Sequence, residues 1–191
     1  MLEPDLLLAA YRHGIFPMAV NARGTIRWFA PDPRAIIPLD ARFHVPHGLR
    51  RTLKKVPFEI TFDRAFPRVM QECAKREEGT WISPQIHTSY CRLHKLGHAH
   101  SVEAWADGEL VGGLYGVYIG AAFFGESMFH RATDASKVAL VTLVERLRQR
   151  GFVLLDTQWQ TPHLTQFGTR EIPRAEYLQI LERAVTFPVE F

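Results

Sequence analysis

The sequence predicts an α+β fold in which helices flank a mixed β-sheet. Short runs of strand-like alternation are interspersed with amphipathic segments of helical length along most of the chain. An Asp107-Gly108 turn between two long apolar runs is typical of a β-hairpin. The chain has 191 residues, 47% of them hydrophobic and 23% charged, so it is large enough to enclose one substantial core.

The N-terminal part is expected to be the least regular. A helix is predicted over about 4–13, with a proline near its start and Gly14 at its end. The segment that follows is rich in proline and glycine and is expected to be irregular up to Pro33. We therefore divide the chain into a small N-terminal segment, residues 1–33, and a main domain, residues 34–191.

The main domain is expected to alternate between strands and helices. The strands are predicted over 58–62, 99–106, 109–118, 121–129 and 152–155. The helices are predicted from about Pro46, and over 63–75, 83–97, 134–150, 161–167 and 173–185. Asp63 is expected to cap the helix over 63–75, and Gly151 to end the helix over 134–150.

Several classes of protein are disfavoured by composition and by missing motifs. No apolar run approaches the roughly 20 residues that span a bilayer, so no membrane association is expected. Cys73 and Cys91 suggest no disulfide framework, which favours a reducing cytoplasm. His94, His98 and His100 lack the further ligands of a zinc site, so no metal is expected. The sequence also contains no phosphate-binding loop for ATP or a dinucleotide.

Basic side chains gather on the helix that begins near Pro46. Arg50, Arg51, Lys54 and Lys55 share one face by helical spacing, although the whole chain has a net charge of only +3. Such a face can bind a phosphate backbone without reading its sequence. The alternative is an ordinary solvated helix face.

Two neighbouring strands combine glycines with a single carboxylate. Their sequences are Gly-Gly-Leu-Tyr-Gly at 112–116 and Phe-Phe-Gly-Glu-Ser-Met-Phe at 123–129. Glycine inside a strand marks a bulge or a close approach, and a carboxylate among apolar residues needs a polar partner. We therefore predict an apolar pocket with one polar anchor. Glu126 would receive an amino group of a ligand, or alternatively pair with a buried cation such as Lys137.

The last predicted strand ends in Asp156 and Gln158, at an edge of the sheet where ligands commonly bind. Residues two apart in a strand project to the same side, so Asp156 could orient the amide of Gln158. That amide oxygen could then accept a hydrogen bond from an amine. The alternative is that Asp156 caps the turn that follows.

Further motifs extend over most of the chain. They are Ala-Tyr-Arg-His-Gly-Ile-Phe-Pro at 10–17, Pro-Asp-Pro-Arg at 31–34, Gly-Thr-Trp-Ile at 79–82, Leu-Gly-His-Ala-His-Ser-Val-Glu at 96–103, Ala-Ser-Lys at 135–137 and Leu-Asp-Thr-Gln at 155–158. With the two glycine-containing segments, and in this order, they resemble the bacterial leucyl/phenylalanyl-tRNA–protein transferases.

The resemblance implies a main domain of the GCN5-related N-acetyltransferase-like (GNAT) fold. It implies that Leu or Phe, with Met as a further candidate, moves from Leu-tRNA or Phe-tRNA to the α-amino group of proteins with N-terminal Arg or Lys. The product would carry an N-degron, a terminus that marks it for degradation. No cofactor and no ATP are expected, because the aminoacyl ester is already activated. We expect a cytoplasmic monomer.

The resemblance also implies roles for individual residues. The catalytic pair would be Asp156 and Gln158. The aminoacyl pocket would contain Leu114, Gly125, Glu126, Met128, Leu143, Leu147 and Leu155. The 3′-terminal adenosine would lie near Trp81, Tyr90 and Met18, and the tRNA backbone on Arg50, Arg51, Lys54 and Lys55. The chain departs from the family pattern at Met18 and Phe29, where many members have tryptophan, and at Thr157, often a cysteine.

Two other functions would fit parts of the sequence. An acyl-CoA-dependent N-acetyltransferase would share the fold but would need a glycine-rich pyrophosphate loop at a helix start, and residues 130–136 contain no glycine. An RNA-binding module could use the basic helix and the aromatic residues alone. It would leave the predicted pocket unexplained.

Overall fold

The computed structural model describes residues 1–55, 57–77 and 79–191, and over these ranges the chain forms helices and strands in alternation. The helices are α1 (Pro4–Arg12), α2 (His47–Lys55), α3 (Phe66–Ala74), α4 (Pro84–Lys95), α5 (Ala135–Arg150), α6 (Pro162–Thr165) and α7 (Arg174–Ala184). The strands are β1 (Phe16–Ala19), β2 (Ile26–Phe29), β3 (Arg34–Ile37), β4 (Glu59–Phe62), β5 (Ala99–Ala106), β6 (Glu109–Ile119), β7 (Ala122–His130), β8 (Leu154–Gln158) and β9 (Arg170–Ile172).

Seven strands form one sheet in the order β4-β5-β6-β7-β8-β3-β9, and β1 and β2 form a separate antiparallel pair. In the large sheet β7 and β8 run parallel, whereas the other neighbouring strands of the described chain run antiparallel. The sheet is therefore mixed, and the predicted α+β class is confirmed.

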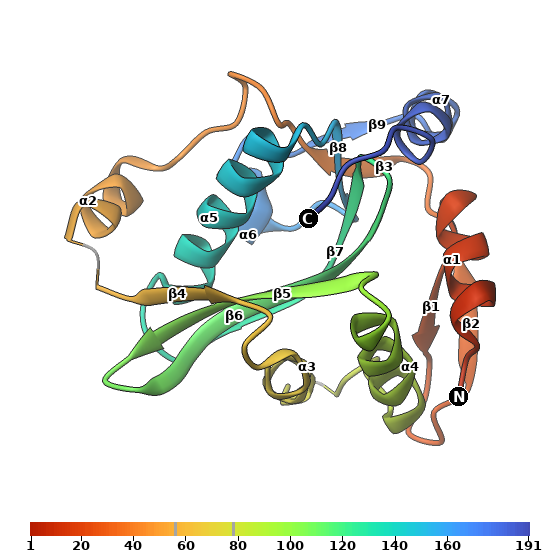
Figure 1. Ribbon diagram of the computed structural model, residues 1–191, viewed down its shortest axis with the longest axis horizontal. Coiled ribbons are helices and arrows are strands. Elements are labelled where there is room, and N and C mark those ends of the chain that lie inside the picture. The colour runs from red at the N-terminus through yellow and green to blue at the C-terminus, as the bar shows by residue number, and fades with distance from the viewer. Residues whose placement is uncertain (56, 78) are drawn as a thin grey trace.

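Helices cover both faces of this sheet (Figure 1). The long helix α5 lies on one face, and α3 and α4 lie on the other. Adjacent strand residues point to opposite faces. Phe123 accordingly packs in the core beneath α5, and Phe124 packs with α1, α3, α4 and α7. Gly151, at φ +81°, ends α5 as predicted.

The N-terminal part is more regular than predicted. The segment expected to be irregular contains the antiparallel pair β1–β2, which runs from Phe16 to Phe29. Immediately after this pair, β3 enters the large sheet between β8 and β9. Neither β3 nor β9 was predicted. These strands are only three or four residues long. Their pairing partners fix them, since strand propensity depends strongly on context.

The prediction that Asp63 caps a helix is wrong. Helix α3 begins at Phe66. Its N-cap residue is Ala65, and no side chain caps the helix by a hydrogen bond. Asp63 has φ +60°, and its carboxylate instead accepts a hydrogen bond from the backbone N–H of Ser101 at 3.0 Å and contacts Nδ1 of His100 at 2.7 Å. It therefore ties the loop before α3 to β5.

The last strand that was predicted, over 152–155, also differs from the structure, because β8 begins at Leu154 and continues to Gln158. Only Leu154 and Leu155 of the predicted run belong to it, and both are buried. In the parts of the chain that are described, no helix has the length and apolar character to cross a membrane.

Candidate active site

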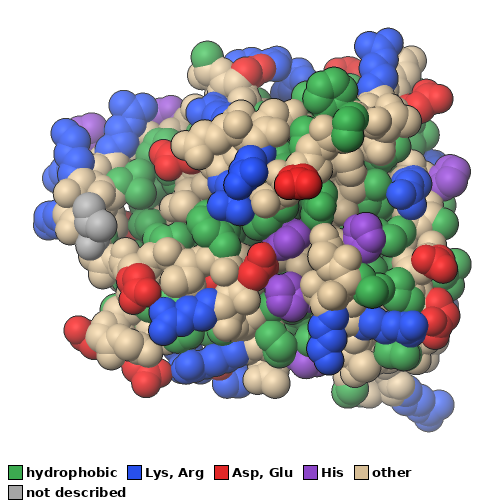
Figure 2. All heavy atoms as spheres, in the orientation of Figure 1, with side chains coloured by type: hydrophobic (Ala, Val, Ile, Leu, Met, Phe, Trp, Pro, Cys, Tyr) green, Lys and Arg blue, Asp and Glu red, His purple; other side chains and the backbone are tan. Residues whose placement is uncertain are grey.

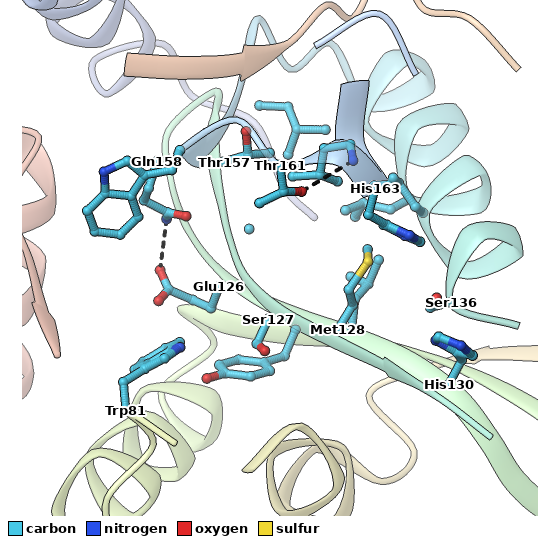
Figure 3. Close-up of a pocket in the computed structure, with 18 of the residues that line it drawn as sticks. Trp81, Glu126, Ser127, Met128, His130, Ser136, Thr157, Gln158, Thr161 and His163 are labelled. Carbon is cyan, nitrogen blue, oxygen red and sulfur yellow. Dashed lines mark hydrogen bonds between the residues drawn. The ribbon is translucent and has the colours of Figure 1, made fainter. Parts of the chain in front are cut away.

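A cavity of about 750 Å³ opens where β7 and β8 separate. The two strands pair over 122–124 and 154–156, and the register ends there although β7 continues to His130. The residues that follow on each strand line the cavity, together with side chains of β1, β6, α5 and the loops before α4 and around α6 (Figure 3). The end of the parallel pairing thus creates the site.

The middle of the cavity is apolar. Leu114 of β6, Met128 of β7, Leu140 and Leu143 of α5 and Leu155 of β8 line it. These residues come from four elements that meet at one face of the sheet, so the slot is continuous with the core beneath α5.

Gly125 lies in the wall of the cavity and provides room there. A Cβ atom added at this position would meet only the backbone oxygen of Asp156, at 3.6 Å, which is an ordinary contact. Gly116 on the neighbouring strand is different, because its added Cβ would lie 2.3 Å from the backbone oxygen of Phe124. The first glycine therefore shapes the cavity, and the second allows the strands to approach.

Glu126 supplies the polar end of the cavity. Its Oε1 accepts a hydrogen bond from the Tyr11 hydroxyl at 2.6 Å and one from Nε2 of Gln158 at 3.5 Å. Burial raises the pKa of Glu126 to about 8, and the Asp156 carboxylate nearby also raises it, against the Tyr11 hydrogen bond and the Arg34 charge. The expected alternative of a pair with Lys137 is wrong, because Lys137 binds Asp134 at 3.0 Å.

The Tyr11 hydroxyl is itself hydrogen-bonded to that of Tyr90. Burial, reinforced by the Glu126 charge, raises the pKa values of both tyrosines well above the ordinary range. Both hydroxyls therefore keep their protons at neutral pH. They hold the Glu126 side chain from behind, and Tyr90 does not line the cavity.

Asp156 lies behind the cavity wall and is completely buried. Its carboxylate accepts hydrogen bonds from Nε and Nη2 of Arg34 at 2.9 and 2.6 Å and from the Tyr177 hydroxyl at 2.7 Å. Arg34 is also buried and gives its remaining bond to the carbonyl of Gly14 at 2.8 Å. Burial alone would lower the pKa of Arg34, but the adjacent carboxylate raises it overall.

Gln158 is the member of the predicted pair that reaches the cavity. It has φ +61°, so its side chain does not continue the strand alternation. Asp156 accepts a hydrogen bond from the backbone N–H of Gln158 at 2.9 Å and makes no bond to its amide. The predicted hydrogen bond between Asp156 and Gln158 is therefore present, but it reaches the backbone of the turn rather than the side-chain amide. The alternative, that Asp156 holds the turn, is the one the structure bears out, and the amide faces Glu126 (Figure 3).

Most residues of the predicted site meet at this cavity. Those that line it are Met18, Trp81, Leu114, Gly125, Glu126, Met128, Leu143, Leu155 and Gln158. Leu147 is fully buried in the core beneath α5, and Tyr90 and Asp156 stand behind the lining residues. Thr157 also lines the cavity.

Other residues of the site had no predicted role. Tyr11, Arg34 and Tyr177 hold the two carboxylates, and Trp159 and His163 line the cavity. Tyr11 and Arg34 belong to motifs recognisable in the sequence, at 10–17 and 31–34. The carboxylates that they hold lie more than a hundred residues away in the chain, so the contacts become visible only in the folded structure.

The four predicted basic residues lie on α2 and are all exposed. Figure 2 shows Lys and Arg side chains gathered over this helix at the left edge of the molecule. Thr52 of α2 donates a hydrogen bond to Asp134, the residue before α5, at 2.9 Å. This bond connects the basic helix to the end of α5 that adjoins the cavity. Across the described residues no cluster of His, Cys, Asp and Glu is suited to a metal.

Comparison with known proteins gives the following similarities. A family model described as leucyl/phenylalanyl-tRNA protein transferase matches residues 36–182, and a model of the N-terminal domain of that family matches residues 1–32. The chain is 58% identical over 186 residues to the leucyl/phenylalanyl-tRNA–protein transferase of Akkermansia muciniphila, covering 96% of each chain. It is 58% identical over 190 residues to that of Herpetosiphon aurantiacus, covering 100% of this chain and 98% of the other.

Among solved structures the likeness is more distant. L-PGS from Bacillus licheniformis gives a TM-score of 0.44 at 16% identity, covering 85% of this chain and 55% of that one. A ribosomal-protein-alanine N-acetyltransferase from Brucella melitensis gives 0.40 at 16% identity, covering 64% of this chain and 89% of the other.

Proposed function

The chain belongs to the leucyl/phenylalanyl-tRNA–protein transferase family, and we propose that it moves leucine or phenylalanine from tRNA to proteins that begin with arginine or lysine. Methionine is a further donor amino acid in this proposal. The acceptor is the α-amino group of the protein, and the product carries an N-degron.

One observation carries the proposal: an apolar slot ends at a carboxyl group and an amide. The slot between β6, β7, β8 and α5 fits the side chain of leucine or phenylalanine. Glu126 and Gln158 then lie where the amino and ester groups of that amino acid would be. A β-branched side chain would be crowded, and discrimination of this kind yields about 1–3 kcal/mol per methylene.

The reaction needs no external energy source. The α-amine nitrogen of the acceptor attacks the carbonyl carbon of the aminoacyl ester and forms the peptide C–N bond. The bond between that carbon and the ribose oxygen breaks, and the proton lost by the nitrogen ends on the ribose oxygen. The site must therefore orient the amine and move one proton.

Glu126 and Gln158 are suited to these two tasks. With a pKa of about 8, Glu126 exchanges a proton near neutral pH, so its ionised form can accept one from the attacking ammonium or amine. An amide is a poor base, but the oxygen of Gln158 can accept a hydrogen bond and orient the amine. At one end of the cavity, Gln158 thus orients the amine and Glu126 transfers the proton.

In this proposal Asp156 is a positioning residue. It holds the backbone of Gln158 in its left-handed conformation and neutralises Arg34. Its loss would displace the amide of Gln158 and would also weaken the fold. The catalytic contact with substrate falls to Gln158, although the two residues depend on each other.

The tRNA end is proposed to lie along the same face. Trp81 and Met18 line the cavity and would contact the terminal adenosine, with Tyr90 supporting the wall from behind. The exposed basic residues of α2 would contact phosphates of the acceptor arm, which fixes position without reading sequence.

The remaining features of the proposal concern the whole molecule. We propose that residues 1–33 form a small N-terminal subdomain and residues 34–191 the transferase domain. We propose that the protein acts as a monomer in the cytoplasm, where aminoacyl-tRNA is available. No cofactor takes part in the proposed reaction.

The test is a transfer assay with purified protein and no ATP. Leu-tRNA or Phe-tRNA is supplied with a peptide whose first residue is Arg or Lys, and with the same peptide acetylated at its α-amine as a control. We expect a new peptide bond on the free peptide and none on the acetylated one. Failure with both tRNAs and both peptides, or acetylation of the peptide from acetyl-CoA instead, would contradict the proposal.

A further inference from the structure

Trp159 is a large aromatic side chain that opens onto the cavity. It lines the cavity, and 41% of its surface is exposed. An apolar ring left open in a concave site, next to polar groups, is typical of a ligand-binding surface. None of the roles described above uses it.

The ring is held firmly on one side. Gln158 turns the chain with φ +61°, and the backbone N–H of Trp159 donates to the carbonyl of Thr157 at 2.7 Å. The indole then packs edge-to-face on Phe16 at 5.2 Å between ring centroids and on Phe29 at 6.2 Å. Such contacts fix the orientation of the ring and leave its remaining surface to the cavity.

The neighbouring lining is uncharged and suited to a flat apolar group. Phe16 and Met18 lie two apart on β1, so they project to the same side of the strand, and both line the cavity. A thioether is polarisable and adapts to an aromatic partner. Figure 3 shows Trp81 on the same side of the cavity as Glu126 and Gln158, and His130 and Ser136 on the opposite side.

We propose that Trp159 stacks on the terminal base of the aminoacyl-tRNA, an inference that rests on the function proposed above. The base and the aminoacyl ester are carried by one ribose, so the base must lie within a nucleoside's length of the reacting carbonyl. Trp159 follows Gln158 directly in the chain and lines the same cavity as Glu126 and Gln158, so its ring belongs to the wall that adjoins the polar end. Stacking on an aromatic ring is independent of base identity and holds the donor without reading its sequence.

A cationic side chain of the acceptor is the competing occupant. The rings around Trp159 already face a cation, because the Arg34 guanidinium lies 5.0 Å from the centroid of Phe16. A second guanidinium or ammonium would have to share the Phe16 ring with Arg34. A nucleobase is uncharged and is therefore favoured.

Three variants test the proposal: Trp159→Ala, Trp159→Phe and, as a matched control, Trp28→Ala. Trp28 is 39% exposed on β2 and is not among the residues that line the cavity. The Michaelis constants for Phe-tRNA and for an Arg-peptide are measured separately, after thermal unfolding shows that each variant folds. For Trp159→Ala we expect the Michaelis constant for Phe-tRNA to rise about 5- to 150-fold, as for loss of one base–aromatic stack. Trp159→Phe should lose less, and the control should match the wild type.

Binding of puromycin, an aminoacyl-adenosine analogue, tests the stack without turnover. Trp159→Ala should bind it more weakly by a similar factor. Equal puromycin binding and an unchanged Michaelis constant for Phe-tRNA would overturn the proposal, as would a rise confined to the Arg-peptide. Absence of transfer by the wild type would instead contradict the proposed function, and puromycin binding would still decide the role of Trp159.

Discussion

Replacing Asp156 with alanine should destabilise the whole protein, and the size of the loss follows from its surroundings. Asp156 is 0% exposed and Arg34 1% exposed, with their nearest atoms 2.6 Å apart. Removing one partner of a buried pair leaves an uncompensated charge, which typically costs about 3–5 kcal/mol. For a chain of this size, 1 kcal/mol shifts the melting temperature by roughly 2–4 °C. The expected decrease is therefore on the order of 6–20 °C.

The measurement is urea and thermal unfolding followed by circular dichroism. Asp40→Ala is the matched control, because Asp40 pairs with Arg42 at 2.5 Å but both side chains are more than half exposed. An exposed pair contributes about 0–1 kcal/mol, so this variant should unfold nearly as the wild type does. The double variant Arg34→Met with Asp156→Leu should lose less than the sum of the two single changes, because the two sites are coupled.

Activity of Asp156→Ala is then assayed well below its own melting temperature. The positioning role predicts that transfer falls together with stability. A variant that unfolds within about 1 kcal/mol of the wild type would refute the reasoning. If it also lost all transfer, Asp156 would act in the chemistry itself.

The remaining predictions concern the cavity and the basic helix. In the wild type kcat/KM should rise with pH around 8, the pKa of the Glu126 carboxyl, and Glu126→Gln should remove this rise. The acceptor amine titrates at a similar pH, so the informative quantity is the ratio of the variant's pH profile to that of the wild type. The same raised pKa means that the folded wild type binds the extra proton, so its stability relative to the variant should fall as pH rises from about 5 to 8 in unfolding experiments. Gly125→Ala should fold normally and transfer phenylalanine less well than leucine, and normal phenylalanine transfer by this variant would contradict the prediction. Gly116→Ala should instead lower the free energy of unfolding. Lys54→Ala should weaken tRNA binding and flatten its salt dependence, with kcat unchanged, whereas Lys95→Ala on α4 should bind tRNA as the wild type does.

The long helices and the central hairpin could be predicted because their signals are local. Helix α5 is a long run rich in apolar residues with a glycine at its end, and Asp107-Gly108 specifies the turn between β5 and β6. Strands β1, β2, β3 and β9 are too short to show a period. β3 and β9 are determined by pairing with strands distant in the chain, and β1 and β2 by pairing with each other, so no local period could predict them.

In the candidate site too, local features could be predicted from the sequence and distant contacts could not. Glu126 stood out because a carboxylate in an apolar run needs a partner, but the identity of that partner, Tyr11, depends on a contact across 115 residues. The alternative of a buried cation such as Lys137 is wrong, because Lys137 pairs with Asp134. Asp156 was noticed at the end of a strand, yet its position behind Gln158 depends on Arg34, 122 residues away. Chemistry-bearing residues can thus be found from sequence, whereas their partners cannot.

The place of β3 in the sheet has a consequence for how the protein folds. This strand is made early, yet it pairs with β8 and β9, which are made late. Loops of more than a hundred residues must therefore close before the sheet is complete, and such non-local pairing slows folding. The ion pair between Arg34 and Asp156, which lies behind the turn at Gln158, joins β3 to β8. During synthesis the central hairpin is complete before β8 is made, whereas the wall that carries Gln158 can form only after β8 has been made and has paired with β3.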